Sequence, residues 1–343
     1  MVLPRWPVPV ILVGALAACS TPYVAPPDPV LAQDGRSEDA GADTASLLDT
    51  VDDTGNGTDT AEPTEQKQTV PPCAAWGSPE QTGTVADSDL NEISGVAVSR
   101  RNEGVLWVME DHAAPNQVTA LDALGNRLGT VTLDGVTNND WEDLAVGTCG
   151  DTTCVFVGEI GDNDKDRAWH GVYRFEEPEV PTEGGLDLTV TAELFEYTYP
   201  DGAHDAESLA ITPEGLPVVF SKEYDTDQST AYSFPFLDSS TTVTLETRGR
   251  FYTGSGTEGG AAAATAADLW PDGSRLILRT YGHVWEFTLS EGGLDDLEDA
   301  ARLELTAPSE RQGEAVAYDS VQRRYVTISE DVNPPVWTTS CVE

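Results

Sequence analysis

Short runs of alternating hydrophobic and polar residues fill the chain from about Cys73 to its end. Trp, Tyr, Phe and Val recur within these runs, and Gly, Asp, Asn and Pro separate them. Alternation with period two, broken by frequent turn residues, predicts many short β-strands. One helix-like piece, Leu294 to Arg302, lies between two predicted strands. The pattern therefore predicts an all-β domain.

A repeated motif divides these strands into units. Its clearest copy runs from Asn139 to Ala145, with Glu142 at its centre, and looser copies contain Glu92, Glu207 and Glu314. The long interval between Glu207 and Glu314 leaves room for one more copy, in which Thr265 replaces the glutamate. Self-similarity at roughly 50 residues, with strands inside each unit, is the signature of a β-propeller.

Each unit is predicted to supply four strands, which gives five four-stranded blades. Six blades remain the alternative, because the long second unit has room for extra strands. Its outer strand is expected over Leu188 to Tyr199, and that of the third unit over Val243 to Phe251. The fifth unit has no outer strand of its own, so the ring should be closed by an N-terminal strand near Gln81 to Ala86.

Composition divides the chain into three parts. Residues 1–19 form a predicted lipoprotein signal peptide, residues 20–72 a predicted disordered acidic linker and residues 73–343 the β-propeller domain. The linker is rich in Asp, Thr and Pro and has too few apolar residues to form a core. The net charge of the chain is −42. This charge excludes nucleic-acid binding, which requires Lys and Arg to neutralise phosphates.

An apolar run near the start of the chain ends in Leu16-Ala17-Ala18-Cys19. This segment resembles the lipobox of bacterial lipoproteins, which implies cleavage before Cys19 and acylation of its thiol. An ordinary signal peptide is the alternative. The apolar run is too short to span a membrane, so membrane contact is expected through the lipid anchor only. Ser20 fits sorting to the outer membrane, on its periplasmic or surface face, and the protein is expected to be a monomer.

Four further cysteines are expected to form disulfides, because the chain is predicted to be exported. Cys149 and Cys154 lie on either side of a predicted turn. Cys73 and Cys341 mark the two ends of the predicted domain, which must meet if the ring is to close. A Cys73–Cys341 bridge would stabilise that closure, because in the chain-entropy model the stabilisation by a disulfide increases with the length of the closed loop.

Carboxylates gather at one predicted end of the blades. The start of the first strand and the end of the second lie at the same end of an antiparallel hairpin, so their polar residues should ring one mouth of the channel. Oxygen-only ligands favour Ca²⁺. The predicted metal ligands are Glu92, Asp111, Glu142, Asp143, Glu159 and Asp162. The predicted contacts to a small polar ligand, or to an extracytoplasmic protein partner, are Glu207, Lys222, Arg279, Glu314 and Glu330.

Two functions remain open at this mouth. A Gly-x-Ser-x-Gly elbow and a His-Glu-x-x-His motif are both missing from the sequence, which favours cation and ligand binding over catalysis. The alternative is a metal-assisted hydrolase, for which His204, Glu142 and Glu159 are the acid/base candidates. Glu207 and Lys222 should pair, so the ion is expected near the first two units.

The order of these motifs resembles a group of exported bacterial propeller proteins without settled function. The resemblance covers about Asn91 to Glu330 and includes Glu-Ile-Ser-Gly-Val-Ala, Asn-Asp-Trp-Glu-Asp-Leu-Ala and Gln-Gly-Glu-Ala-Val-Ala. More distantly, it extends to esterase-like phytase, SdiA-regulated and gluconolactonase-type propellers. The phytase and lactonase relatives hold a metal, usually Ca²⁺, at the channel mouth. Their ligand motifs do not match this chain residue by residue.

Overall fold

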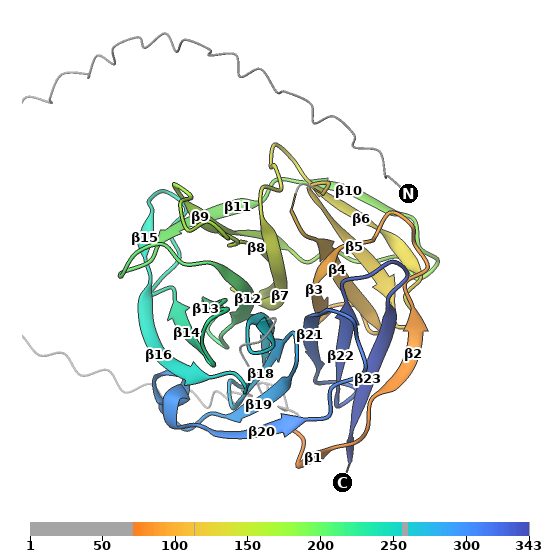
Figure 1. Cartoon of the computed structure of the whole chain (residues 1–343). Coiled ribbons are helices and arrows are strands. Elements are labelled where there is room, and N and C mark those ends of the chain that lie inside the picture. The colour runs from red at the N-terminus through yellow and green to blue at the C-terminus, as the bar shows by residue number, and fades with distance from the viewer. Residues whose placement is uncertain (1–70, 113, 256–259, 343) are drawn as a thin grey trace, which may run out of the picture. The chain divides into compact units, whose positions relative to one another are not determined.

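The computed structural model describes residues 71–112, 114–255 and 260–342 (Figure 1). Within them, five sheets, each with four antiparallel strands at its centre, are arranged around a central axis and form a five-bladed β-propeller. The signal peptide, Cys19 and nearly all of the acidic linker lie outside the described residues. No helix in the described part of the chain is long and apolar enough to cross a membrane.

Each blade has four main strands, and each strand pairs antiparallel with the next. They are given below from the innermost strand outward. The first blade contains β3 (Ile93–Val98), β4 (Val105–Glu110), β5 (Gln117–Asp122) and β6 (Arg127–Leu133). The second contains β7 (Trp141–Cys149), β8 (Thr152–Glu159), β9 (His170–Glu176) and β11 (Glu193–Thr198). The third contains β12 (Ala206–Ile211), β13 (Pro217–Ser221), β14 (Gln228–Ser233) and β16 (Glu246–Tyr252). The fourth contains β17 (Ala264–Leu269), β18 (Arg275–Thr280), β19 (Val284–Thr288) and β20 (Ala301–Leu305). The fifth contains β21 (Gly313–Asp319), β22 (Arg324–Ser329), β23 (Pro335–Val342) and β2 (Glu80–Thr84).

The hydrophobic core lies between blades, in five clusters. Each cluster joins two neighbouring sheets; one contains Trp107 of the first blade and Trp141 of the second, both fully buried. Inner strands are therefore apolar on both faces, as in a sheet covered on both sides. The innermost strands contact one another in the order β3, β7, β12, β17, β21 and back to β3. This closed order selects five blades over six.

The predicted N-terminal closure of the ring is confirmed. β2 pairs antiparallel with β23, with Gln81 opposite Trp337, and β1 (Ala75–Trp76) pairs with the end of the same strand. Cys73 and Cys341 form the predicted disulfide, with their Cα atoms 5.5 Å apart. The fifth blade is thus built from both ends of the domain.

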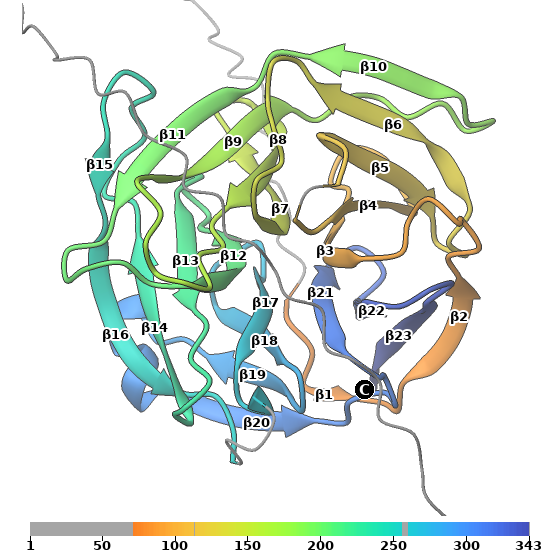
Figure 2. The ribbon, with the colours of Figure 1, turned by 45° about the horizontal axis from the view of Figure 1, so that its top comes forward.

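The outer strands of the second and third units differ from the prediction. The predicted strand Leu188 to Tyr199 is two strands: β10 (Leu186–Val190) pairs in parallel with β6 of the first blade, and only β11 belongs to the second (Figure 2). Likewise, β15 (Val243–Thr244) pairs with β11, and β16 belongs to the third blade. An alternating pattern does not show which neighbour a strand pairs with. These extra strands cover the outer edges of two blades.

Gly129 permits the close approach of β10 to β6. Its φ is +152°, and a Cβ at this position would lie 2.1 Å from the carbonyl oxygen of Leu186. The helix-like piece predicted at Leu294 to Arg302 is a 3₁₀ helix, Gly293–Asp299, followed by β20.

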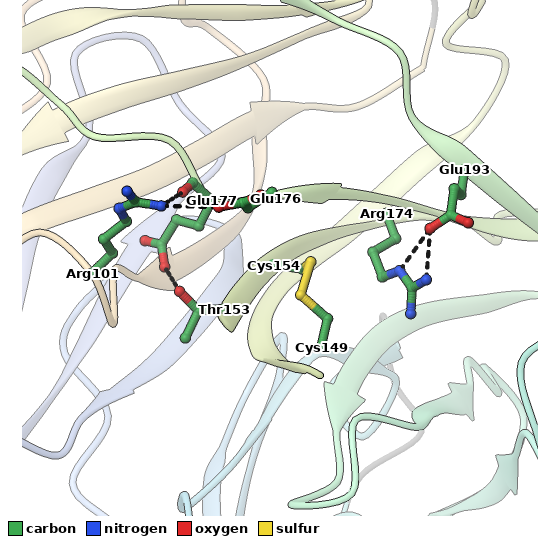
Figure 3. The surroundings of a disulfide bond; sticks show 8 residues. All are labelled: Arg101, Cys149, Thr153, Cys154, Arg174, Glu176, Glu177 and Glu193. Carbon is green, nitrogen blue, oxygen red and sulfur yellow. Dashed lines mark hydrogen bonds and ion pairs between the residues drawn. A yellow bond between two sulfur atoms is a disulfide. The ribbon is translucent and has the colours of Figure 1, made fainter. Parts of the chain in front are cut away.

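The second predicted disulfide, Cys149–Cys154, links β7 and β8 across their turn (Figure 3). Glu177 follows β9 beside this turn and is fully buried. Its carboxylate accepts hydrogen bonds from Thr153 Oγ1 at 2.7 Å and from Trp107 Nε1 at 3.0 Å. This buried acid joins the first two blades at the end of the channel opposite the predicted mouth.

Candidate functional site

A β-bulge recurs at the same place in every blade. In the first blade Ile93 pairs with Glu110 and Gly95 with Met109, so the residue between them has no partner in the ladder. Such bulges redirect side chains and are common next to functional sites. The five bulge residues, each at most 5% exposed, are Ser94, Glu142, Glu207, Thr265 and Glu314.

The bulges correct one step of the repeat alignment. Ser94, rather than Glu92, is the counterpart of Glu142 in the first blade. Glu92 lies two residues earlier and is exposed. Thr265 does occupy the predicted glutamate position, and its Oγ1 donates a hydrogen bond to the Gly313 carbonyl of the next blade at 2.9 Å. The Ser94 hydroxyl also donates to a carbonyl of the next blade, that of the bulge residue Glu142 itself. The ring thus contains three carboxylates and two hydroxyls.

Three carboxylates from the first two blades converge at the mouth. One oxygen each from Asp111, Asp140 and Glu142 lies within 4.8 Å of the others. Asp111 follows β4, Asp140 precedes β7, and the bulge places Glu142 between them. Gly161 packs against this carboxylate cluster: a Cβ there would lie 2.3 Å from Glu142 Oε1. A side chain at this position would therefore push the carboxylates apart.

Burial and mutual repulsion disfavour the ionised forms of Asp111, Asp140 and Glu142, and Arg167, 3.9 Å from Asp140 Oδ2, offsets this only in part. Burial raises the pKa of Glu142 well above its usual value, and the negative charge of Asp111 raises it further. The pKa values of Asp111 and Asp140 are also raised, chiefly by burial. No hydrogen bond or ion pair from a described residue reaches the Glu142 carboxylate, although its side chain is almost entirely buried. A bound cation would relieve this arrangement.

Sequence reasoning missed Asp140, which lies two residues before the bulge. Its backbone N–H donates to Glu159 at 3.0 Å, and the N–H of Asn139 donates to the same carboxylate at 3.2 Å. Glu159 also forms a buried ion pair with Arg167. Its carboxylate is therefore occupied in holding the Asp140 loop, and the structure places it outside the cluster. Sequence reasoning also missed His112 as a neighbour of the cluster, since its Nδ1 lies 3.3 Å from Asp140 Oδ1.

Asp162 and Asp143 also lie outside the carboxylate cluster, because backbone amides occupy them. Asp162 closes its own loop by accepting from the N–H of Asp166 at 2.9 Å, and His170 Nε2 lies 3.2 Å away. Asp143 is fully buried and accepts N–H donors from three blades: Leu144 and Leu209, both at 2.8 Å, and Ala267 at 3.2 Å. It therefore holds the inner strands of the second, third and fourth blades together.

The expected pair of Glu207 and Lys222 is present and almost completely buried. The ammonium group also lies 5.1 Å from the ring centres of both Tyr224 and Tyr281. Its positive charge reaches across the mouth. The charge of Lys222 lowers the pKa of five carboxyl groups, although burial raises each of these pKa values by more. The five are Asp111, Glu142, Asp205, Glu314 and Glu330.

Glu314 and Glu330 form a pair of neighbouring carboxyl groups in the fifth blade. Burial raises the pKa of Glu314 to about 8, and the charge of Glu330 adds to the shift. The Gln312 side-chain amide donates to Glu314 Oε1 at 2.9 Å and also to Glu330. Two adjacent carboxyl groups cannot both ionise without compensation. At neutral pH this pair therefore retains a proton that it could donate or exchange.

Arg279 does not belong to the mouth. It lies inside β18 rather than after its end, and its guanidinium forms a buried ion pair with Glu310 at 2.7 Å. Tyr281, just past β18, occupies the position at which Lys222 follows β13 and Glu330 follows β22. The sequence pattern predicts that this strand ends at Leu278, two residues before its actual end at Thr280, and therefore places Arg279 just beyond the strand. The partner, Glu310, is remote in sequence and carries no motif that would have revealed the pair.

His204, the predicted acid/base candidate, is held by acidic and phenolic neighbours. Its Nε2 lies 3.0 Å from both Asp201 Oδ1 and the Tyr232 hydroxyl. The pKa of His204 is raised, first by the hydrogen bond to Glu223 and also by that to Asp201, against the opposing effect of burial.

Comparison with known proteins gives similarity of fold alone. No family model matches the chain, and no curated protein matches it. Many solved structures resemble it, among them the β-propeller domain of Myceliophteria thermophila Cps50 (Swd1). That similarity has 11% sequence identity and a TM-score of 0.37, over 73% of this chain and 84% of the other.

Proposed function

We propose that this propeller binds a divalent cation, Ca²⁺, at the channel mouth through Asp111, Asp140 and Glu142. The observation that carries the proposal is the convergence of three carboxylate oxygens within 4.8 Å. Glu142, which is 3% exposed, has no described hydrogen-bond or ion-pair partner for its carboxylate. Hard oxygen donors suit Ca²⁺, which accepts six to eight of them in flexible geometry.

The rest of the mouth supports the binding of a small polar ligand next to the ion. Three carboxylates leave coordination positions for water or ligand oxygens. Lys222, Tyr281 and the Glu314–Glu330 pair offer a cation, a phenol and a proton-bearing carboxyl group on other blades. A ligand with several oxygens would meet both donors and acceptors at this mouth.

Replacing Glu142 by Gln is expected to weaken Ca²⁺ binding by at least about tenfold, equivalent to about 1.4 kcal/mol. Glutamine preserves the shape but removes the charge of the buried ligand. Glu207→Gln is the matched control, because Glu207 is also a buried bulge residue but already pairs with Lys222. We expect it to change Ca²⁺ affinity by less than about threefold. Isothermal titration calorimetry on the purified propeller would measure both.

Equal effects of the two substitutions would contradict the proposed ligand set. Failure of the unmutated protein to bind Ca²⁺ at millimolar concentration would refute the proposed function itself. Thermal melting in EDTA should show that Glu142→Gln is folded, because a neutral side chain suits this buried position in the absence of the ion.

We further propose that the propeller is anchored to the cell envelope through acylated Cys19. Cys19→Ala should abolish acylation and either release the protein from the membrane fraction or leave its signal peptide uncleaved. Membrane fractionation and electrophoretic mobility, compared with the unmutated chain, would measure both effects. Unchanged fractionation together with unchanged mobility would rule out the anchor.

A further inference from the structure

A cavity lies at the end of the propeller opposite the carboxylate mouth. Inner strands β3, β7, β17 and β21 all start at the mouth, and residues at or just beyond their other ends line the cavity. Its volume is about 350 Å³, within the range of small-molecule sites. None of the residues assigned to the mouth lines it.

The carboxylates that line this cavity are already engaged. Asp268 accepts the N–H groups of Leu269 and Tyr318, each at 2.8 Å. Asp319 pairs with Arg324 at 2.9 Å, and Asp272 accepts from Ser274 N–H at 2.9 Å. The aspartates thus serve the local backbone and a neighbouring arginine, and they leave little acceptor capacity for a ligand.

Arg100 is the basic residue of the cavity lining. It is exposed, and in the described part of the chain its guanidinium forms neither a hydrogen bond nor an ion pair within 4.0 Å. The preceding residue is fixed, because the Ser99 hydroxyl donates to buried Glu177. Arg101, by contrast, pairs with Glu176 at 3.2 Å (Figure 3) and with Glu179 at 3.3 Å.

The remaining walls of the cavity are largely apolar. Trp270 and Tyr318 meet edge to face, with ring centroids 5.0 Å apart. Val98 and Pro271 also line the cavity, and Val321 at its rim is 69% exposed. A large exposed valine beside aromatic side chains offers apolar surface that a ligand would cover. The cavity therefore combines an apolar wall with one guanidinium that forms no hydrogen bond in the described part of the chain, although its charge also acts on buried Asp268 and Glu177.

We propose that this cavity binds a small organic carboxylate that carries an apolar group. The carboxylate would bind Arg100, since a guanidinium matches a carboxylate with two parallel N–H···O bonds. The apolar group would lie against Trp270, Tyr318 and Val321. The site does not depend on the cation at the mouth, because the two sets of residues lie at opposite ends of the channel.

The test uses 3-phenylpropionate and its uncharged amide as probes, titrated calorimetrically into the purified protein. The carboxylate should bind saturably, and the amide roughly tenfold more weakly, because it cannot form the charged pair. Arg100→Gln should weaken binding of the carboxylate by a similar factor and leave binding of the amide little changed. Arg101→Gln is the matched control, and Glu142→Gln tests independence from the mouth; both should bind 3-phenylpropionate as the unmutated protein does.

Three results would overturn this inference. The first is the absence of saturable binding of 3-phenylpropionate by the unmutated protein. The second is equal affinity of the unmutated protein and Arg100→Gln for the carboxylate, which would show a site selected by apolar contact alone. The third is loss of binding in Glu142→Gln, which would show instead that the probe binds at the mouth and would contradict the proposed location.

Discussion

Replacing Asp143 by Ala is expected to lower the free energy of unfolding by about 3 kcal/mol. Its carboxylate accepts backbone N–H groups from three blades, and alanine would leave all three buried without acceptors. Each unpaired buried donor costs about 1–3 kcal/mol. Part of that cost is offset, because burial raises the pKa of Asp143 well above its usual value and the ionised group is itself unfavourable there.

Urea denaturation followed by tryptophan fluorescence would measure the loss. Asp151→Ala is the control, since Asp151 is exposed in the β7–β8 turn. An unchanged unfolding midpoint for Asp143→Ala would show that Asp143 does not hold the three blades together.

Removing the Cys73–Cys341 disulfide should destabilise the propeller by about 5.6 kcal/mol in the chain-entropy model. The bridge spans 268 residues and therefore restricts the unfolded chain strongly. The Cys149–Cys154 bridge spans five residues, so its removal should cost only about 2 kcal/mol by the same relation. The two paired Cys→Ser variants form a matched comparison of long and short loops.

Equilibrium denaturation under non-reducing conditions would measure both values. A smaller loss for Cys73/Cys341 than for Cys149/Cys154 would show that pairing of β2 with β23 holds the ring closed without help from the bridge. The expected order of the two losses depends on loop length, and strain in either bridge is not needed to explain it.

Local patterns predicted the fold well. Alternating runs marked the strands, the recurrence near Glu142, Glu207 and Glu314 marked the blades, and the missing fifth outer strand predicted the pairing of β2 with β23. What local patterns could not show was the neighbour chosen by a strand at a blade edge. β10 and β11 form one alternating stretch in the sequence, yet they join different blades.

The site was predicted only in outline. Matching acidic residues to one another placed Glu92 opposite Glu142, whereas matching the apolar strand Val96-Ala97 to Leu144-Ala145 would have selected Ser94. Acidic residues also have two uses that look alike in sequence. Glu142 is left without a partner, while Asp143, the next residue, is bonded to three amides. Only the folded backbone separates these roles.

The shared construction of the fifth blade has a consequence for how the chain is made. β2 is synthesised before the other four blades but finds its partner, β23, only when nearly the whole domain has followed. A propeller emerging residue by residue from a ribosome or a translocation pore therefore carries an unpaired strand throughout. Contacts between such distant segments form slowly because of the loop-closure entropy. We therefore expect closure of the ring to be the last event, and we expect a stalled or truncated chain to remain an open array of blades with two exposed edges.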